Sequence, residues 1–224
     1  MSKAAPLEDW LAAVTNAAPR NLALYEQALT HGSASATHYE RLEFLGDRVL
    51  GLIVADWLYE RFPQEKEGQL SRRFNQLVAG DTCAAVARQI DVRAHLRLGK
   101  QARDDGAIDS DNVLGDVMEA LIGALYLDAG MEPARALVRR LWEPLVEGQA
   151  SAPKHPKSAL QEWAAANNRR PPFYDLIDRS GPQHALRFTV AVTINGAGQA
   201  RGEGTSKQEA ETAAAAALLE QLQG

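Results

Sequence analysis

Apolar residues in the first two thirds of the chain recur at steps of three and four residues, which is the period of an amphipathic α-helix. The pattern covers residues 41–61, 69–90, 111–128 and 133–147. Glycine and proline residues fall between these runs, where helices are expected to end. Up to that point, no segment keeps the two-residue alternation of a β-strand for long. The sequence therefore predicts an all-helical domain over residues 1–148.

The pattern changes after this domain. Two prolines, a glycine and small polar side chains follow in close succession, so we expect a linker at residues 149–155. Beyond the linker, residues 156–168 and 206–223 have helical patterns, and three strand-like runs lie between them, at residues 172–180, 186–194 and 198–206.

The tail, residues 156–224, therefore has the predicted element order α-β-β-β-α. It is too short for a parallel, doubly wound fold, because each crossover in such a fold needs a dozen or more residues. We expect an antiparallel three-stranded sheet with both helices on one face. The whole chain is thus predicted to be mainly α, with an all-helical domain followed by a small α+β domain.

The composition excludes several classes of protein. A single cysteine, Cys83, rules out an internal disulfide framework and a multi-cysteine zinc site, and its apolar helical setting favours a buried thiol. No apolar run approaches the roughly 18 residues that a bilayer crossing requires. The N-terminal residues include acids where a signal peptide would need an uninterrupted apolar stretch. We therefore expect a cytoplasmic protein without a membrane partner.

The charge is unevenly distributed along the chain. The net charge of −5 argues mildly against nucleic acid as a partner. From Lys154 onward, however, eight basic and seven acidic residues give +1, which leaves −6 for the remainder. A nearly neutral tail behind an acidic domain is compatible with RNA binding if its basic residues cluster on one face.

Three carboxylates, those of Glu40, Glu43 and Asp47, interrupt the first strongly apolar helix. At about 100° per residue they fall within roughly a 60° arc. Apolar side chains are expected on the opposite side of this helix, namely Leu42, Leu45, Val49 and Leu52. Taken alone, the arc is typical of a solvated helix face, although like charges at this spacing repel one another.

A second pair of carboxylates, Asp116 and Glu119, interrupts the strongly apolar run 112–128. Carboxylates among apolar neighbours need partners, and a hard divalent cation can serve as one. If the two acidic helices cross, they form an all-oxygen site suited to Mg²⁺ or Mn²⁺. A structural ion pair with Arg41 or Arg48 is the competing interpretation. A di-iron site is disfavoured, because neither acidic group supplies a Glu-x-x-His pair.

Three motifs resemble the endonuclease domain of the ribonuclease III family: YERLEFLGDRVLG at 39–51, RFPQEKEGQLS at 61–71 and GDVMEALIGALYLD at 115–128. The tail resembles the double-stranded-RNA-binding domain that follows in the simple bacterial form. The resemblance covers nearly the whole chain. It implies a Mg²⁺-dependent homodimeric endoribonuclease, in which Mn²⁺ can substitute. The implied reaction hydrolyses double-stranded RNA to 5′-phosphate and 3′-hydroxyl ends with short 3′ overhangs, and the implied substrates are ribosomal RNA precursors and some messenger RNAs.

The same resemblance implies roles for particular residues. It identifies four metal ligands: Glu43, Asp47, Asp116 and Glu119. Among the catalytic residues it includes Asp47, Glu119, Glu40 and Glu67. Phe44 matches a residue that family members bury in a pocket of the partner subunit, so it is expected at a homodimer interface.

In the tail, four residues are candidates for RNA binding: Gln161, Glu162, His184 and Lys207. Double-stranded RNA is recognised by shape, through its minor groove and its phosphates. The chain departs from the family pattern after Lys207, because Gln208, Glu209 and Glu211 follow where relatives carry several basic residues. Fewer basic residues predict weaker RNA binding with a shallower salt dependence.

Two other functions remain open at this stage. The chain could be a catalytically silent regulator that binds double-stranded RNA, with its helical domain serving only for dimerisation. It could also be a helical scaffold without catalysis. An inactive descendant would be expected to lose some of the acidic residues, whereas all six are present here.

Overall fold

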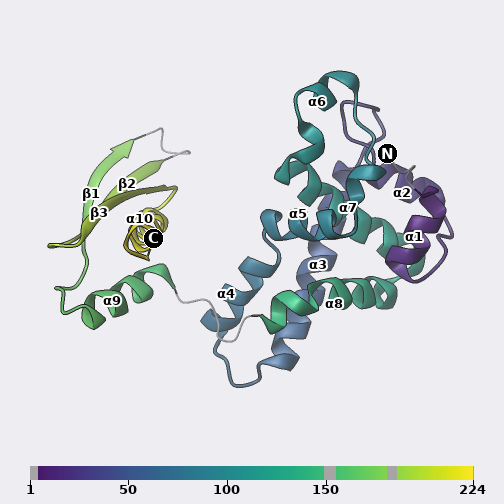
Figure 1. Ribbon diagram of the computed structural model, residues 1–224. Helices are drawn as coiled ribbons and strands as arrows, with labels where there is room; N and C mark the ends of the chain where they lie inside the picture. The colour runs from purple at the N-terminus through teal and green to yellow at the C-terminus, as the bar shows by residue number, and fades with distance from the viewer. Residues whose placement is uncertain (1–4, 149–154, 181–185, 224) are drawn as a thin grey trace. The chain divides into compact units, whose positions relative to one another are not determined.

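The computed structural model describes residues 5–148, 155–180 and 186–223. The chain divides into two compact units, residues 1–152 and 153–224 (Figure 1). The first unit is helical, and the second combines a small sheet with two helices. The predicted fold class, a mainly α protein with a small α+β unit at its end, is therefore confirmed.

The described part of the first unit contains eight α-helices and two short 3₁₀ helices. In chain order they are α1 (Leu7–Thr15), α2 (Leu22–Ala28), α3 (Glu40–Arg61), α4 (Glu67–Leu77), α5 (Gly80–Gln89), η1 (Val92–Ala94), α6 (Lys100–Asp104), η2 (Ala107–Asp109), α7 (Asp111–Ala129) and α8 (Met131–Glu147). The apolar run 69–90 spans two helices, since α4 ends before the Gly80–Asp81 pair. Gly130, with a φ of 90°, allows the turn from α7 into α8.

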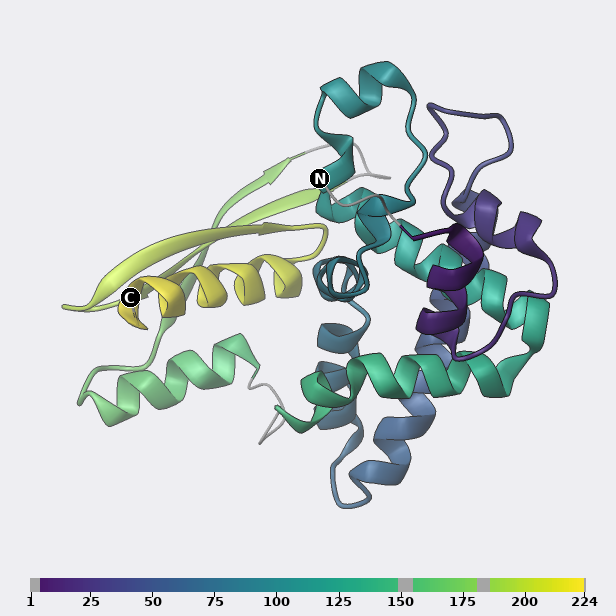
Figure 2. The same ribbon diagram turned by 45° about the vertical axis from the view of Figure 1, so that its right-hand side comes forward.

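Helix α7 forms the centre of this unit and packs most extensively against α3 and α5 (Figures 1 and 2). Eleven residues of α7 are buried, which explains why this segment is apolar around most of its circumference. Trp142 of α8 is also fully buried, and its indole N–H donates to the Leu77 carbonyl oxygen at 2.8 Å.

Two glycines let α3 and α7 cross at backbone contact. A Cβ atom on Gly46 of α3 would lie 1.7 Å from the Glu119 carbonyl oxygen of α7. A Cβ atom on Gly123 of α7 would lie 2.4 Å from the Leu42 carbonyl oxygen of α3. The crossing therefore depends on the absence of side chains at both positions.

The buried side of α3 differs from the expected one. Leu42 and Val49 are buried as predicted, but Leu52 is 58% exposed, so its predicted place in the apolar face was wrong. The crossing with α7 instead buries Leu50 and Val54, which lie seven residues after Glu43 and Asp47 and hence on nearly the same side of the helix. The acidic arc thus continues the buried side of α3 and is not a separate solvated face.

The second unit has the predicted order: α9 (Pro156–Ala166), β1 (Phe173–Ser180), β2 (Arg187–Ile194), β3 (Gly198–Gly204) and α10 (Lys207–Gln223). The strands form one antiparallel sheet in the order β1-β2-β3. Both helices lie on the same face of the sheet (Figures 1 and 2).

A small apolar core joins the two helices of this unit to the sheet. Leu160 of α9 and Leu218 of α10 pack with Val192 and Ile194 of β2. Alanines of α10 allow it to lie directly on β3, where a Cβ atom on Gly202 would be 2.1 Å from the Ala214 amide nitrogen. The alanine-rich end of the chain is therefore a close-packed helix face.

None of the helices in the described ranges combines the length and the apolar character that a membrane crossing requires.

Candidate active site and RNA-binding surface

The α3–α7 crossing brings carboxylates from the two helices together. Glu43 lies one turn before Gly46 on α3, and Asp116 and Glu119 lie one turn apart on α7. Because Gly46 contacts the backbone of Glu119 directly, the carboxylates on either side of the crossing face one another. All three side chains are half-buried. The spacing in the sequence made these residues candidate metal ligands, and the crossing of α3 and α7 brings them together.

Burial and neighbouring carboxylates raise the pKa of all three acids. Burial, followed by the charges of Glu43 and Asp116, raises the pKa of Glu119 from its ordinary 4.5 to about 7. Burial, Asp116 and Glu40 raise the pKa of Glu43. The pKa of Asp116 is also raised, chiefly by burial. In the described ranges, none of the three takes part in an ion pair with a basic side chain.

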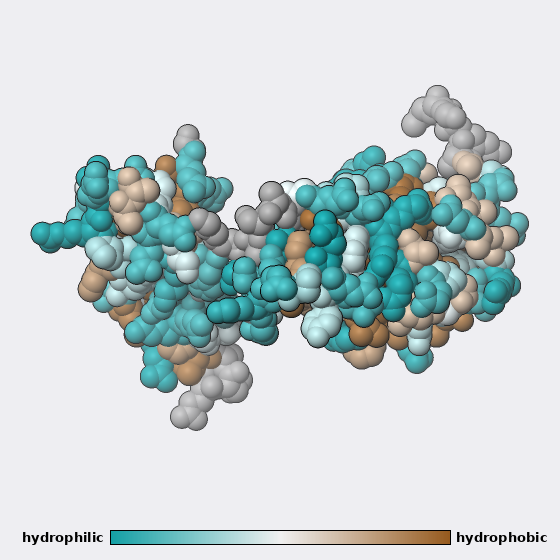
Figure 3. Space-filling view, turned by 90° about the horizontal axis from the view of Figure 1, so that it is seen from below, coloured by the Kyte–Doolittle hydropathy of each residue, from teal (hydrophilic) through white to brown (hydrophobic). Residues whose placement is uncertain are grey.

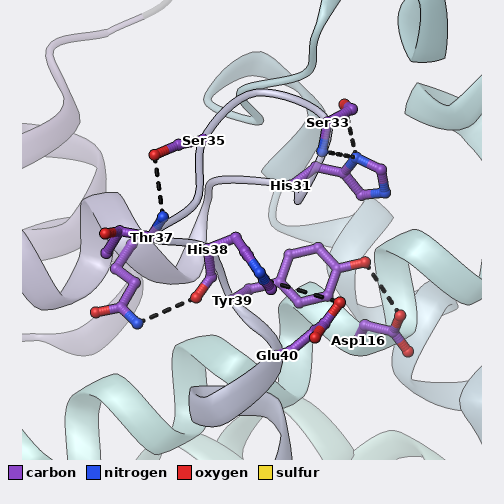
Figure 4. Close-up of polar contacts among 9 residues, drawn as sticks. His31, Ser33, Ser35, Thr37, His38, Tyr39, Glu40 and Asp116 are labelled. Carbon is purple, nitrogen blue, oxygen red and sulfur yellow. Dashed lines mark hydrogen bonds and ion pairs between the residues drawn. The ribbon is translucent and has the colours of Figure 1, made fainter.

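Tyr39 connects the first turn of α3 to Asp116, as Figure 4 shows. Its hydroxyl donates a hydrogen bond to Oδ2 of Asp116 at 3.2 Å, and this bond opposes the upward pKa shift of Asp116. Its carbonyl oxygen accepts the amide N–H groups of Leu42 and Glu43, at 2.8 and 2.9 Å. Its own amide donates to the Thr30 carbonyl oxygen at 3.0 Å. Tyr39 thus fixes the start of α3 relative to α7.

Two histidines lie against the ring of Tyr39 (Figure 4). Nδ1 of His31 is 2.7 Å from the Ser33 hydroxyl oxygen, and the ring of His31 is 5.8 Å from that of Tyr39. Nδ1 of His38 is 3.8 Å from Oε1 of Glu40. Glu40 is largely exposed, so it lies at the edge of the carboxylate group and does not join its buried part.

Asp47 forms an ion pair with Arg48, the residue that follows it. For Asp47 the competing interpretation from the sequence, an ion pair with Arg48, therefore describes the observed contact. The same guanidinium lies 5.3 Å from the centre of the Phe44 ring and lowers the pKa of Glu119.

Glu67 begins α4 and is exposed, and its Oε1 accepts a hydrogen bond from the Ser71 hydroxyl at 2.8 Å. The loop before Glu67 is held by Arg73, whose side chain is buried. Arg73 donates hydrogen bonds to both carboxylate oxygens of Glu65, at 2.7 and 2.8 Å. Its guanidinium carbon also lies 3.8 Å from the centre of the Phe62 ring. Among the described residues, no hydrogen bond or ion pair joins Glu67 to the carboxylates at the helix crossing.

The chemistry of this group fits a divalent cation. Carboxylate oxygens are the ligands that Mg²⁺ and Mn²⁺ prefer, and a cation would offset the burial and the neighbouring negative charges that raise the three pKa values. Over the described ranges, however, no three side chains of the acidic, histidine or cysteine type converge closely enough to hold a metal ion.

Sequence reasoning did not identify two neighbours of the site. Tyr39 lies in the motif at residues 39–51, and its position immediately before Glu40 is the one sequence feature that indicates a role for it. Cys83 of α5 is buried, as expected, and its Sγ lies 3.9 Å from Oε1 of Glu119. Burial and Glu119 raise the pKa of this thiol to about 12, so it remains protonated. No pattern in the sequence links Cys83 to Glu119.

Apolar side chains are exposed near the start of α3. Phe44 is 66% exposed and Leu127 of α7 is 52% exposed. A hollow of about 780 Å³ lies beside Phe44 and is lined in part by Leu24, Leu45 and Leu127. Figure 3 shows that hydrophobic residues interrupt the otherwise hydrophilic surface of this unit. An exposed aromatic ring next to an apolar hollow is a candidate contact surface.

Three of the four candidate RNA-binding residues of the second unit lie on its helices. Gln161 and Glu162 are exposed on α9, and Lys207 is the first residue of α10. Nζ of Lys207 is 3.8 Å from Oε1 of Glu211 on the same helix. His184, the fourth candidate, lies outside the described residues.

Comparisons with known proteins agree with both units. Residues 21–145 match a family model described as ribonuclease-III-like, and residues 156–222 match one described as a double-stranded RNA binding motif. The chain is 62% identical to Ribonuclease 3 of Zymomonas mobilis over 91% of its length and 83% of that protein. It is 50% identical to Ribonuclease 3 of Rhodobacter capsulatus over 88% of each chain.

Among solved structures, the nuclease domain of ribonuclease III from Campylobacter jejuni is similar. Its alignment has a TM-score of 0.60 and 32% identity, and covers 63% of this chain and 97% of that domain. The fold, the site and these matches define an enzyme that joins a nuclease domain to an RNA-binding domain. The chain belongs to the ribonuclease III family.

Proposed function

We propose that this protein is a homodimeric, Mg²⁺-dependent endoribonuclease that hydrolyses phosphodiester bonds in double-stranded RNA. Mn²⁺ is expected to substitute for Mg²⁺. Each subunit would cut one strand and leave 5′-phosphate and 3′-hydroxyl ends with short 3′ overhangs. Ribosomal RNA precursors and some messenger RNAs are the proposed substrates, and the cytoplasm is the proposed location.

The observation that carries this proposal is the group of carboxylates at the α3–α7 crossing. Glu43, Asp116 and Glu119 are half-buried, and burial together with neighbouring carboxylates raises the pKa of each. None of the three forms an ion pair with a basic side chain in the described ranges. Retaining such a group in a helical core destabilises the fold, because like charges repel where the effective dielectric constant is low. A scaffold or a silent regulator gains nothing from it, whereas a metal-dependent nuclease requires it.

We propose that Glu43, Asp47, Asp116 and Glu119 hold the cation, with Asp47 released from Arg48. A bound divalent cation supplies positive charge at the scissile phosphate and makes water more acidic. The residues of the chain position that cation and the RNA. Tyr39 holds Asp116 in place through its hydroxyl, and the apolar residues around the crossing exclude bulk water from the buried side of the carboxylates. The exposed acids Glu40 and Glu67 are proposed to contribute contacts with substrate or further cations.

Dimerisation is proposed to use the surface around Phe44. The exposed ring and the adjacent hollow are self-complementary features of the kind that a two-fold interface joins reciprocally. A nuclease-domain structure of the Campylobacter jejuni relative is described as flexible in a region involved in dimer formation. Two subunits related by a two-fold axis would present two carboxylate groups to opposite strands of one duplex.

The test is cleavage of an end-labelled RNA duplex. The wild-type full chain is assayed in Mg²⁺ and in EDTA, and a Glu119→Gln variant is assayed in Mg²⁺. We expect cleavage only in Mg²⁺ and a loss of at least about a thousandfold in the variant, because it lacks a buried, charged ligand. Glu143→Gln, an exposed acid on α8, is the matched control and should cleave at the wild-type rate. Phosphatase sensitivity of the 5′ ends and 3′ extension by a polymerase identify the product termini.

The outcomes separate the alternatives. Cleavage in EDTA, or full activity of Glu119→Gln, overturns the metal mechanism. Duplex binding without cleavage under any metal condition supports a silent RNA-binding regulator instead. Failure to bind a duplex and to cleave it leaves only a structural role for the chain.

A further inference from the structure

A carboxylate from α10 lies between two lysines of the RNA-binding unit. Oε2 of Glu211 is 2.5 Å from Nζ of Lys157 on α9, and its Oε1 is 3.8 Å from Nζ of Lys207 at the start of α10. The Glu211 side chain is only 17% exposed, so it is enclosed by these partners and does not extend into solvent. One acid therefore compensates the charge of two bases on different helices.

The two lysines differ in how freely they can reach a ligand. Lys157 is held on two sides, by Glu211 and by the ring of Tyr174, whose centre is 5.0 Å from its Nζ. Its side chain is 34% exposed, compared with 61% for Lys207. Lys157 is thus a fixed part of the α9–α10 contact, and Lys207 is the more accessible cation. Gln161, a candidate RNA contact, follows Lys157 by one turn of α9.

The first turn of α10 contains a second engaged acid. Oε2 of Glu209 accepts hydrogen bonds from the amide and the hydroxyl of Thr205, at 2.7 and 2.6 Å. These bonds lower the pKa of Glu209, so it stays ionised. Both acids at the start of α10 therefore have partners within the protein: Glu209 pairs with Thr205, and Glu211 pairs with the two lysines. Only Glu211 is paired with the lysine that would meet a phosphate.

We infer that Glu211 sets the affinity of this unit for duplex RNA by acting as an internal counter-charge to Lys207. This inference rests on the proposed function. A phosphate approaching Lys207 meets the Glu211 carboxylate within a few ångströms of the same ammonium group, so the two anions compete for one cation. The result is weaker binding that releases fewer counterions, and shape recognition then contributes a larger share of the affinity.

The test is binding of a fluorescent RNA duplex by the full chain in EDTA, where cleavage is not expected, over a range of salt concentrations. Glu211→Gln keeps the size and hydrogen bonding of the side chain but removes its charge. We expect the duplex to bind about three- to fivefold more tightly near 0.1 M salt. In a plot of the logarithm of the binding constant against the logarithm of salt concentration, the slope should become more negative by up to about one unit. Glu220→Gln, an exposed acid near the other end of α10, makes the same change in net charge and should have little effect.

A double variant identifies the route of the effect. If Glu211 acts through Lys207, the gain from Glu211→Gln should disappear in a Lys207→Gln background. A gain of equal size in that background, an equal gain from Glu220→Gln, or no gain from Glu211→Gln would each overturn the inference. If wild-type protein does not bind the duplex at all, the proposed function fails first, and this outcome is distinguishable from the others.

The inference can still be tested if Glu211→Gln disturbs the fold, which circular dichroism would reveal. Lys207→Gln alone should then weaken wild-type binding by less than about threefold, because the charge of Lys207 is already partly compensated. A loss of tenfold or more would show that Lys207 is a fully available phosphate contact and would overturn the inference.

Discussion

The hydroxyl of Tyr39 donates to a carboxylate oxygen of Asp116 at 3.2 Å, across 77 positions of the chain. Tyr39 also caps the first turn of α3, through amide hydrogen bonds from Leu42 and Glu43. The orientation of a carboxylate on α7 is therefore coupled to the start of the helix that carries the other acids. A ligand group whose members come from two helices needs such a connection to keep its geometry.

Tyr39→Phe tests this coupling, because it removes one oxygen atom and keeps the buried ring. Without the donor, Asp116 should lose its preferred orientation, and the Mg²⁺ concentration for half-maximal cleavage should rise about tenfold. The maximal rate at saturating Mg²⁺ should change little. A Mn²⁺ binding isotherm measured by electron paramagnetic resonance gives the same comparison without relying on activity.

Tyr59→Phe is the matched control, since Tyr59 is on the same helix but 76% exposed. It should leave Mn²⁺ affinity unchanged. Equal Mn²⁺ affinity in Tyr39→Phe and wild type would show that the hydrogen bond has no role in metal binding.

A second prediction concerns pH and the metal-free protein. The pKa of Glu119 is raised from 4.5 to about 7 by burial and by Glu43 and Asp116, so the folded state binds its proton more tightly than the unfolded state. The contribution of Glu119 to the free energy of unfolding is therefore most favourable below pH 4.5 and falls as the pH rises toward 7. In EDTA, the difference in thermal midpoint between Glu119→Gln and wild type should grow in favour of the variant from pH 5 to pH 8.

The comparison of the two proteins isolates Glu119 from other titrating groups, such as His95, whose pKa is lowered by burial. Differential scanning calorimetry provides the measurement. A difference in midpoint that stays constant over this pH range would mean that Glu119 does not titrate as its surroundings indicate. Saturating Mg²⁺ should reverse the sign of the difference, because the variant lacks one of the four proposed ligands and gains less stability from the cation.

The sequence alone predicted most of the fold and the candidate acids, because both depend on local periodicity. The spacing of Glu43 and Asp47, and of Asp116 and Glu119, put each pair on one side of a helix whatever the tertiary structure. The order of elements in the second unit followed from turn residues and strand alternation. These features need no knowledge of which helix packs on which.

Contacts between distant segments could not be predicted in this way. Leu52 satisfies the helical period but is exposed, because the side that α3 buries is chosen by its crossing with α7. For Asp47 the sequence allows both a metal site and an ion pair with Arg48, and side-chain orientation decides between them. The contact of Cys83 with Glu119 depends on where α5 packs. The contact of Glu211 with Lys157 likewise needs the packing of α9 against α10, whereas its contact with Lys207 follows from their i,i+4 spacing on one helix.

A third prediction addresses dimerisation. Phe44→Ala removes an exposed aromatic side chain beside an apolar hollow, and each subunit of a two-fold dimer would lose one such contact. Burial of a phenylalanine is worth about 2–3 kcal/mol, so the dimer dissociation constant should rise by at least about a hundredfold. Light scattering at low micromolar concentration should then detect monomer. Tyr59→Ala removes another exposed aromatic residue of α3, and a comparable dissociation of that variant would refute the assignment of the interface to Phe44.

A last prediction tests the crossing on which the carboxylate group depends. A methyl group on Gly46 would lie 1.7 Å from the Glu119 carbonyl oxygen, so Gly46→Ala must push α3 and α7 apart. We expect the free energy of unfolding to fall by about 3 kcal/mol. Metal binding should weaken as well, because Glu43 moves away from Asp116 and Glu119.

Gly51→Ala on the same helix is a stringent control. Its methyl group would meet the Phe74 ring at an ordinary contact distance of 3.5 Å, and alanine favours helix over glycine by about 0.5–1 kcal/mol. Urea unfolding in EDTA should therefore show a lower free energy of unfolding for Gly46→Ala and an unchanged or higher one for Gly51→Ala. If Gly46→Ala were as stable as Gly51→Ala and bound Mn²⁺ normally, the helices could not be in backbone contact there, and the grouping of the three carboxylates would need another explanation.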